Sequence, residues 1–207
     1  SVSGFAIGDR VTGDPNIACG RCAYCHAGRV NLCRNLQAIG IHRDGGLADY
    51  VIVPQKQAFQ LPASLDPAYG ALCEPLACCI HGIYVAQIQS GSTVLVLGGG
   101  VIGLLTVQLA KLAGAQVILA TRQKSKRDLA IRLGATAVID PSKTDIQAEM
   151  MNLTQGGADV VMECAGVPET VEQAPKLSRP GGTVVIVGVV SQRLKVTYEP
   201  FDLLFRE

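Results

Sequence analysis

Thr-Val-Leu-Val-Leu-Gly-Gly-Gly-Val-Ile-Gly, residues 93–103, is the stretch that decides the fold. An apolar run typical of a β-strand leads directly into glycines, after which a helical pattern begins. Gly98, Gly100 and Gly103 satisfy G-x-G-x-x-G. The first glycine permits a tight turn, the second lets a pyrophosphate approach the backbone, and the third lets the helix pack closely on the strand. The stretch therefore predicts a strand, a phosphate-holding turn and the start of a helix.

The helix expected over about residues 101–113 contributes to the same phosphate site. Its first residues, Val101 and Ile102, carry main-chain N–H groups that have no partner within the helix, and the positive end of the helix dipole lies there. Both features favour a bound pyrophosphate. Glycines also punctuate ordinary turns, so the motif alone leaves a purely structural turn open.

Strand-like and helical patterns alternate after the glycines. The expected strands lie at 116–120, 137–139, 158–163 and 183–187, and the expected helices at 124–133, 145–154 and 168–177. Gly114 and Gly134 follow helix ends, and Pro180-Gly181-Gly182 predicts a turn into the last strand. This alternation is what a parallel, doubly wound sheet of the α/β class requires.

Composition narrows the classes of function. The 207 residues suffice for one large domain or two small ones, and a hydrophobic content of 48% is ample for a buried core. The formal net charge of +1 gives no broad electrostatic reason to bind nucleic acid or an anionic membrane. Residues 94–110 are nearly uncharged, but glycines, Thr106 and Gln108 interrupt them, and a membrane span needs about 20 apolar residues. No export signal is recognisable, so the expected location is the cytoplasm.

Neither end of the sequence resembles a natural terminus. Ser1 opens it without Met in a glycine-punctuated stretch, and Glu207 closes it directly after the apolar segment 201–205. We therefore expect an internal portion of a longer polypeptide. Residues 196–205 are expected to form an edge strand.

Residues 1–75 differ from the rest of the chain in composition and in hydrophobic pattern. They are rich in Gly, Pro and Cys, with short β-like runs at 10–12 and 47–53, the second after the turn signal Asp44-Gly45-Gly46. A helical segment at 69–88 then leads into the glycine-containing region. We expect a separate, mostly β domain over residues 1–75 and a nucleotide-binding domain over residues 76–207.

Four of the eight cysteines, Cys19, Cys22, Cys25 and Cys33, fall within fifteen positions. Four thiolates can enclose a tetrahedral Zn²⁺ with no open position, which is how a structural zinc holds an irregular loop. Disulfides are disfavoured because no signal peptide directs the chain to an oxidising compartment. An iron–sulfur cluster is the more serious rival, although the ferredoxin pattern continues with a spacing of three and a Pro, whereas here the spacing is seven and Arg34 follows. Structural zinc is the favoured interpretation.

Several motifs occur in a characteristic order: Gly8-Asp9-Arg10-Val11, the cysteine quartet, Asp-Gly-Gly-Leu-Ala-Asp-Tyr at 44–50, Glu74-Pro75-Leu76-Ala77 and the three glycines. Together they resemble the zinc-containing medium-chain dehydrogenase/reductase family, most of all its polyol (sorbitol-type) and threonine dehydrogenase branch. The resemblance covers essentially the whole chain. It implies part of a GroES-like catalytic domain with a structural zinc lobe over 1–75, and a Rossmann domain, incomplete at its C-terminal end, over 76–207. It also implies oxidation of a small secondary alcohol or polyol by hydride transfer to NAD or NADP. It further implies a homo-dimer or homo-tetramer, in which a strand such as that expected at 196–205 often pairs between subunits.

The family also holds a catalytic zinc, and here the sequence departs from the pattern. The upstream Cys and the Gly-His-Glu segment of the family do not occur, and the resemblance implies that they would precede Ser1. Only Glu74 falls on a matching position, where the family uses it as a zinc ligand or as a partner of the zinc-bound water. The plain alternative is a carboxylate near a helix start, which gains about 0.3–1 kcal/mol from the dipole. We expect these residues to bind zinc at the cysteine lobe but to lack a complete catalytic metal site.

Four side chains near Glu74 could also bind a metal, but we expect them to be packing residues of their helix instead. They are Cys73, Cys78, Cys79 and His81.

The residues after the second expected strand indicate which nicotinamide cofactor binds. NAD-preferring domains place Asp or Glu there to bind the ribose 2′-hydroxyl, whereas this sequence has Thr121 and Arg122. A hydroxyl and a guanidinium can hold a 2′-phosphate. Lys126 and Arg127 would lie in the first turn of the next helix, where the dipole disfavours cations unless a phosphate offsets them. The sequence thus predicts NADP over NAD, with Lys126 or Arg127 assisting, and a solvated basic surface is the alternative.

Two further loops are expected to line the nicotinamide half of the cofactor. Cys164-Ala165-Gly166 follows the fourth strand and Val187-Gly188 the fifth, and ligands of this fold bind beyond the carboxyl ends of the strands. The counterparts in the family line the nicotinamide, although Gly166 and Gly188 could also be plain turn residues. A competing function from another class is a non-catalytic redox sensor that binds a nucleotide with the same fold.

Overall fold

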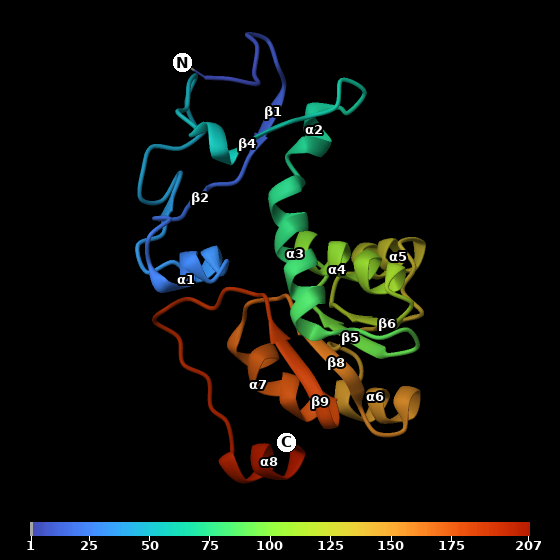
Figure 1. Ribbon diagram of the computed structural model, residues 1–207. Helices are drawn as coiled ribbons and strands as arrows, with labels where there is room; N and C mark the ends of the chain where they lie inside the picture. The colour runs from blue at the N-terminus through green and yellow to red at the C-terminus, as the bar shows by residue number, and fades with distance from the viewer. Residues whose placement is uncertain (1) are drawn as a thin grey trace. The chain divides into compact units, whose positions relative to one another are not determined.

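The computed structural model describes residues 2–207, which divide into two compact units, one ending at Glu74 and the other spanning Pro75–Glu207. Figure 1 shows the elements of each unit. The predicted boundaries of the two domains, 1–75 and 76–207, stay a prediction.

The second unit is built on a five-stranded parallel sheet with the strand order β7-β6-β5-β8-β9. Counted from β5, which comes first along the chain, this is the order 3-2-1-4-5 of a Rossmann sheet. The predicted doubly wound α/β fold is therefore confirmed. The strands are β5 (Thr93–Leu97), β6 (Gln116–Ala120), β7 (Ala137–Ile139), β8 (Ala158–Glu163) and β9 (Ser178–Ile186).

Two hydrophobic clusters, one on each face, cover the sheet. Along β5, Val94 and Val96 belong to the first cluster and Leu95 and Leu97 to the second, because successive side chains of a strand point to opposite faces. Side chains of α3 (Cys73–Ala86), α4 (Val101–Leu112) and α5 (Lys124–Arg132) pack into the first cluster. Those of α6 (Ile146–Thr154) and α7 (Pro168–Leu177) pack into the second. Burial on both faces explains why β5 and β6 are almost uninterrupted apolar runs.

The helix ends follow signals that are visible in the sequence. Pro168 occupies the first turn of α7, and the Asp145 carboxylate caps α6 by accepting from the Gln147 N–H at 2.9 Å. Gly114 and Gly134, which follow α4 and α5, have φ of 87° and 104°, a left-handed conformation that favours glycine.

The last strand differs from its prediction. β9 begins at Ser178 instead of residue 183, so the expected turn at Pro180-Gly181-Gly182 lies inside the strand. The pairing shifts register between Ala158–Ser178 and Val160–Thr183, so the extra residues bulge out of the ladder. Pro and Gly are tolerated at such a bulge, which is why they do not end the strand.

The edge strand predicted at 196–205 is wrong. Residues 200–206 instead form the helix α8 (Pro200–Arg206), in which Pro200 occupies the first turn. Phe201 and Phe205 lie one helical turn apart with ring centroids separated by 4.7 Å. Subunit pairing through such a strand therefore loses its basis, and the homo-dimer or homo-tetramer stays a prediction.

The first unit consists of short elements. β1 (Val11–Gly13) pairs antiparallel with β4 (Ala58–Gln60), and β2 (Asn16–Ile17) with β3 (Gln37–Ala38). Between them lie α1 (Ala23–His26) and two 3-10 helices, Val30–Leu32 and Gln55–Gln57. The long helix expected at 69–88 is divided into α2 (Pro67–Gly70) and α3.

The strand predicted at 47–53 is also wrong. Residues 47–53 form no strand in the structure, and the side chains of Leu47, Tyr50 and Ile52 are all more than 90% exposed. An alternating pattern becomes a strand only when another strand supplies hydrogen bonds, and none of the described strands pairs with these residues. Across residues 2–207, no helix has the length and apolar character needed to cross a membrane.

Candidate functional site

The candidate site lies at the carboxyl ends of β5 and β8, which are neighbours in the sheet. The helices that follow these strands, α4 and α7, pack on opposite faces, so this is the position where doubly wound sheets bind their ligands. The Cys164 N–H donates to the Leu97 carbonyl at 2.8 Å, and the Gly98 N–H donates to the Ala120 carbonyl at 2.9 Å. These bonds join the ends of β8 and β6 to the glycine turn.

Each glycine of the turn meets a different constraint. Gly98 has φ of 103°, and a Cβ there would lie 2.9 Å from the Ala165 nitrogen. A Cβ at Gly103 would lie 1.9 Å from the Gly98 carbonyl oxygen, so the close approach of α4 to the turn requires glycine. Gly100 instead faces open space, with no atom within 4 Å of its would-be Cβ.

The open space at Gly100 is where the structure fits a pyrophosphate. Gly100 is the N-cap of α4 and no side chain caps this end of the helix. The first main-chain N–H groups of α4, at Val101 and Ile102, have no partner within the helix. A bare backbone, unpaired donors and the positive end of a helix dipole together suit a dinucleotide's phosphates.

Gly99 brings the turn against the loop that follows β6. A Cβ at Gly99 would lie 3.0 Å from the Thr121 Oγ1 and 3.1 Å from the Lys126 Cβ. Two of the residues predicted to contact a 2′-phosphate are therefore next to the glycine turn. The motif assigns no role to this middle glycine, and the run of three consecutive glycines was the only sequence signal for it.

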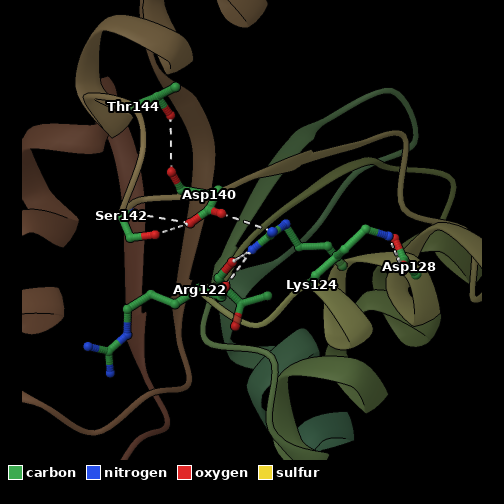
Figure 2. A network of polar contacts seen from close by, with 8 residues as sticks. Arg122, Lys124, Asp128, Asp140, Ser142 and Thr144 are labelled. Atoms are coloured by element: carbon green, nitrogen blue, oxygen red, sulfur yellow. Dashed lines mark hydrogen bonds and ion pairs between the residues drawn. The ribbon is translucent and has the colours of Figure 1, made fainter.

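Arg127 is held by the protein itself (Figure 2). Its Nη1 donates to the carbonyls of Thr121 at 2.6 Å and Arg122 at 2.7 Å, and its Nη2 lies 2.9 Å from the Asp140 Oδ2. Both side chains of this ion pair are only 13% exposed. Arg127 thus fixes the loop after β6, which is a positioning role. Sequence reasoning missed Asp140.

Arg122 contrasts with Arg127. Its side chain is exposed, and Figure 2 shows it extending away from the ion pair. Lys124, one turn before Asp128 in α5, forms an exposed surface ion pair with that residue at 2.7 Å. The Arg122 side chain is therefore directed outward, whereas those of Lys124 and Arg127 are held by ion pairs.

Asp140 is stabilised as a carboxylate from two sides. Its Oδ1 accepts from the Ser142 hydroxyl at 2.6 Å and the Ser142 N–H at 3.1 Å. The Ser142 hydroxyl, then the Ser142 N–H and then the Arg127 charge hold the pKa of Asp140 below its ordinary value. The turn after β7 and the loop after β6 are thereby joined through one charged pair.

Glu163, the last residue of β8, organises the two loops expected at the nicotinamide half. Its Oε1 accepts from the N–H groups of Ala165 and Gly166, and its main-chain carbonyl accepts from those of Val187 and Gly188. The distances range from 2.8 to 3.0 Å. Sequence reasoning did not single out Glu163, although an acid at the end of an apolar strand was a visible signal.

Cys164 follows Glu163 and is half-buried. Burial raises the pKa of its thiol to about 12, although a contact with the Thr106 hydroxyl at 3.9 Å acts in the opposite direction. The thiol is therefore neutral at physiological pH and is not activated as a nucleophile.

The four sulfur atoms of Cys19, Cys22, Cys25 and Cys33 all lie within 4.8 Å of one another. The Sγ of Cys25 lies 3.6 Å from that of Cys22 and 4.0 Å from that of Cys19. A tetrahedral zinc with Zn–S bonds of about 2.3 Å places its sulfurs about 3.8 Å apart. The quartet therefore fits a zinc ion, and it is the only such group within residues 2–207.

Short helices place these thiols. Cys22 is the N-cap of α1, Cys25 lies within α1, and Cys33 caps the 3-10 helix Val30–Leu32. Main-chain N–H groups of Arg34 and Cys25 lower the pKa of Cys22 to about 6, while burial raises that of Cys25 to about 11. The ordered backbone therefore favours thiolate at one sulfur, and a metal would deprotonate the others.

Glu74 lies in the first turn of α3 and is exposed. It is not part of the sulfur quartet, so its catalytic role stays a prediction. Cys79 is fully buried, with its Sγ 3.5 Å from the Ile102 carbonyl, and Cys73 is half-buried, as expected of packing residues. Cys78 and His81 are exposed, so that expectation is wrong for them, because the buried residues of α3 are Cys79, Gly82 and Ala86.

The family profile described as zinc-binding dehydrogenase matches residues 101–207, just over half of the chain. This chain belongs to the zinc-binding dehydrogenase family. The profile of the alcohol dehydrogenase GroES-like domain matches residues 1–63. The resemblance seen in the sequence is therefore confirmed, as is a GroES-like unit preceding a Rossmann unit.

Relatives with assigned activities are similar along most of this chain. The sorbitol dehydrogenase of Halalkalibacterium halodurans is 40% identical over 195 residues, which cover 92% of this chain and 57% of that protein. The L-threonine 3-dehydrogenase of Pyrococcus abyssi is 35% identical over 199 residues, which cover 95% of this chain and 57% of that protein. The chain thus spans little more than half the length of these relatives.

A solved structure with high similarity is that of a protein from Sinorhizobium meliloti described as a zinc-binding dehydrogenase and bound to NADP. It is 64% identical with a TM-score of 0.93, covering 99% of this chain and 61% of that one.

Proposed function

We propose that the protein containing this chain is a zinc-dependent oxidoreductase that transfers hydride between a secondary alcohol or polyol and NADP. Family membership and the fold support this proposal. Because the chain spans about 57% of its relatives, the activity of the whole protein is inferred from them and from the site.

The observation that carries the cofactor choice is the loop after β6. Where an NAD-preferring domain has an acid, this loop has Thr121 beside the glycine turn and an exposed Arg122. A carboxylate there would repel a 2′-phosphate, whereas a guanidinium can bind it with two parallel hydrogen bonds. Thr121, Arg122 and Lys126 are proposed as contacts of that phosphate, with Arg127 as the residue that positions them.

The other proposed contacts are those with the pyrophosphate, the nicotinamide and the structural zinc. The turn from Gly98 to Gly103, with Val101 and Ile102, would hold the pyrophosphate. The loops Cys164-Ala165-Gly166 and Val187-Gly188 would orient the nicotinamide. The sulfur quartet would hold a structural zinc that staples its lobe.

Glu74 is proposed as the contribution of this chain to a catalytic zinc site, either as a ligand or as a partner of the zinc-bound water. A catalytic zinc supplies a Lewis acid that stabilises the alkoxide formed on the substrate. A zinc held by the thiolates of Cys19, Cys22, Cys25 and Cys33 suits a reducing compartment, so we place the protein in the cytoplasm. A homo-oligomer stays part of the proposal on the resemblance alone.

Titration with NADPH and NADH, followed by the fluorescence of the reduced nicotinamide, tests the proposal. The chain has no Trp, so protein emission interferes little. We expect NADPH to bind at least about tenfold more tightly, a difference of about 1.4 kcal/mol. Equal or tighter binding of NADH would overturn the cofactor assignment. Binding of NADPH without turnover of polyols, threonine or secondary alcohols by the full-length protein would favour the redox sensor.

A further inference from the structure

Glu163 is a fully buried carboxylate that the proposed chemistry does not use. Its side chain is 0% exposed at the end of β8. Burying a carboxylate is unfavourable unless hydrogen bonds compensate for the lost water. The partners of Glu163 therefore indicate what it does.

Those partners come from two separate loops and from the first turn of α7. The Oε1 accepts from the Ala165 N–H at 2.8 Å, the Gly166 N–H at 3.0 Å and the Thr170 hydroxyl at 2.7 Å. The main-chain carbonyl of the same residue accepts from the Val187 and Gly188 N–H groups at 2.8 and 2.9 Å. One residue thus holds the loop after β8 with its side chain and the loop after β9 with its backbone.

The second carboxylate oxygen shows how tightly these loops pack. The Oε2 is buried without a hydrogen-bond partner among the described residues. A Cβ at Gly188 would lie 2.5 Å from this oxygen and 2.3 Å from the Gly166 nitrogen. The Oε2 therefore lies against the backbone of the second loop, and no side chain fits between the two loops at this point.

We propose that Glu163 is a positioning residue that sets the spacing of the two nicotinamide-side loops. This inference rests on the proposed function, because it concerns the loops that would orient the nicotinamide. The adenosine half has its own support, since the Arg127–Asp140 ion pair and the glycine turn shape the loop after β6. Disturbing Glu163 therefore weakens binding of the nicotinamide half alone.

The test compares NADPH with adenosine 2′,5′-bisphosphate, which lacks the nicotinamide half, by calorimetry on the purified chain. Glu163→Asp keeps the charge but withdraws the carboxylate by one methylene, whereas Glu163→Gln keeps the reach and loses the charge. We expect E163D to weaken NADPH binding about tenfold or more, because the shorter side chain loses at least one charge-assisted hydrogen bond to the loop after β8. Binding of the bisphosphate should stay within about twofold of wild type, and E163Q should retain most NADPH affinity because its amide oxygen still accepts.

A second variant keeps the test decisive if E163D does not fold. Gly188→Ala pushes the loops apart directly and should weaken NADPH binding while sparing the bisphosphate. Equal losses for both ligands, or a harmless E163D beside a harmful E163Q, would overturn the inference. A wild-type chain that binds neither ligand would instead refute the proposed function itself.

Discussion

The guanidinium of Arg127, in the first turn of α5, lies 2.9 Å from the carboxylate of Asp140, the residue that follows β7. The same guanidinium donates to the carbonyls of Thr121 and Arg122. A cation at the start of a helix opposes the helix dipole, and here a protein carboxylate offsets it instead of a ligand phosphate. The loop after β6 is therefore shaped by contacts within the protein, and Arg122 is left to face outward.

Replacing Arg122 by Ala is expected to remove the preference for NADPH. The variant loses a charge-assisted contact with the 2′-phosphate, which corresponds to about 1.5–3 kcal/mol, or roughly a 10- to 150-fold weaker NADPH complex. NADH affinity should change little, because NADH has no phosphate at this position. Fluorescence titration with both cofactors measures the change, and Arg122→Lys, which keeps the charge without the planar fork, should lie between wild type and R122A. Unchanged NADPH binding in R122A would contradict the assignment.

Replacing Arg127 by Met should have a different signature from R122A. The loop carbonyls lose their donor and Asp140 loses its partner, so the melting temperature should fall. NADPH and NADH should both bind several-fold more weakly, because the whole loop is displaced and not only its phosphate contact. Thermal melting and the same two titrations measure this. A loss confined to NADPH would show that Arg127 contacts the phosphate directly.

The Asp140 carboxylate also predicts how stability depends on pH. The Ser142 hydroxyl and the Arg127 charge lower the pKa of Asp140 in the folded state. A lowered pKa stabilises the fold above the ordinary carboxyl value of about 3.9, and this stabilisation is lost as the pH falls through the folded pKa. Wild type should therefore melt above Asp140→Asn at neutral pH, and the two curves should converge below about pH 4. A difference that persists in acid would exclude this ionisation as its cause.

The parts of the fold predicted from sequence are those that local signals determine. The central strands are runs of apolar residues bounded by Gly, and Pro168 and Gly114 mark helix ends through their backbone conformations. The segments at 47–53 and 196–205 were predicted wrongly, because a strand depends on a partner that its own sequence does not contain.

In the candidate site, too, the sequence predicted the features that depend on neighbouring residues and missed those that depend on distant ones. The roles of the three spaced glycines follow from their own spacing and reappear as separate steric constraints. The sequence could not distinguish Arg122 from Arg127, because the distinction depends on Asp140, thirteen residues beyond Arg127 and on the far side of another strand. Glu163 was missed for the same reason, since its partners after β9 lie far along the chain.

Metal analysis of the purified chain should find one zinc per chain and no visible absorbance. The sulfur quartet fits a single tetrahedral ion, and thiolate-bound zinc is colourless. Cys22→Ser removes a ligand that is the N-cap of α1 and should abolish stoichiometric zinc, whereas Cys78→Ser, a matched change at an exposed cysteine outside the quartet, should retain it. Brown colour would indicate an iron–sulfur cluster instead, and two tightly held zinc ions would contradict the expectation that these residues lack a complete catalytic site.

Removing that zinc should affect the two units unequally. The quartet lies in a lobe of short elements with little buried core, so a strong chelator or C22S should unfold this lobe and lower its melting temperature. The five-stranded sheet has its own two hydrophobic clusters, so NADPH affinity should stay within about threefold of wild type, a change of less than 1 kcal/mol. Loss of NADPH binding in parallel with loss of zinc would show that the metal supports the dinucleotide site as well as its own lobe.

The affinity of the sulfur quartet for zinc should depend on pH. Burial raises the pKa of Cys25 to about 11, so zinc must displace a proton from this thiol. The zinc affinity should therefore rise with pH over the neutral range.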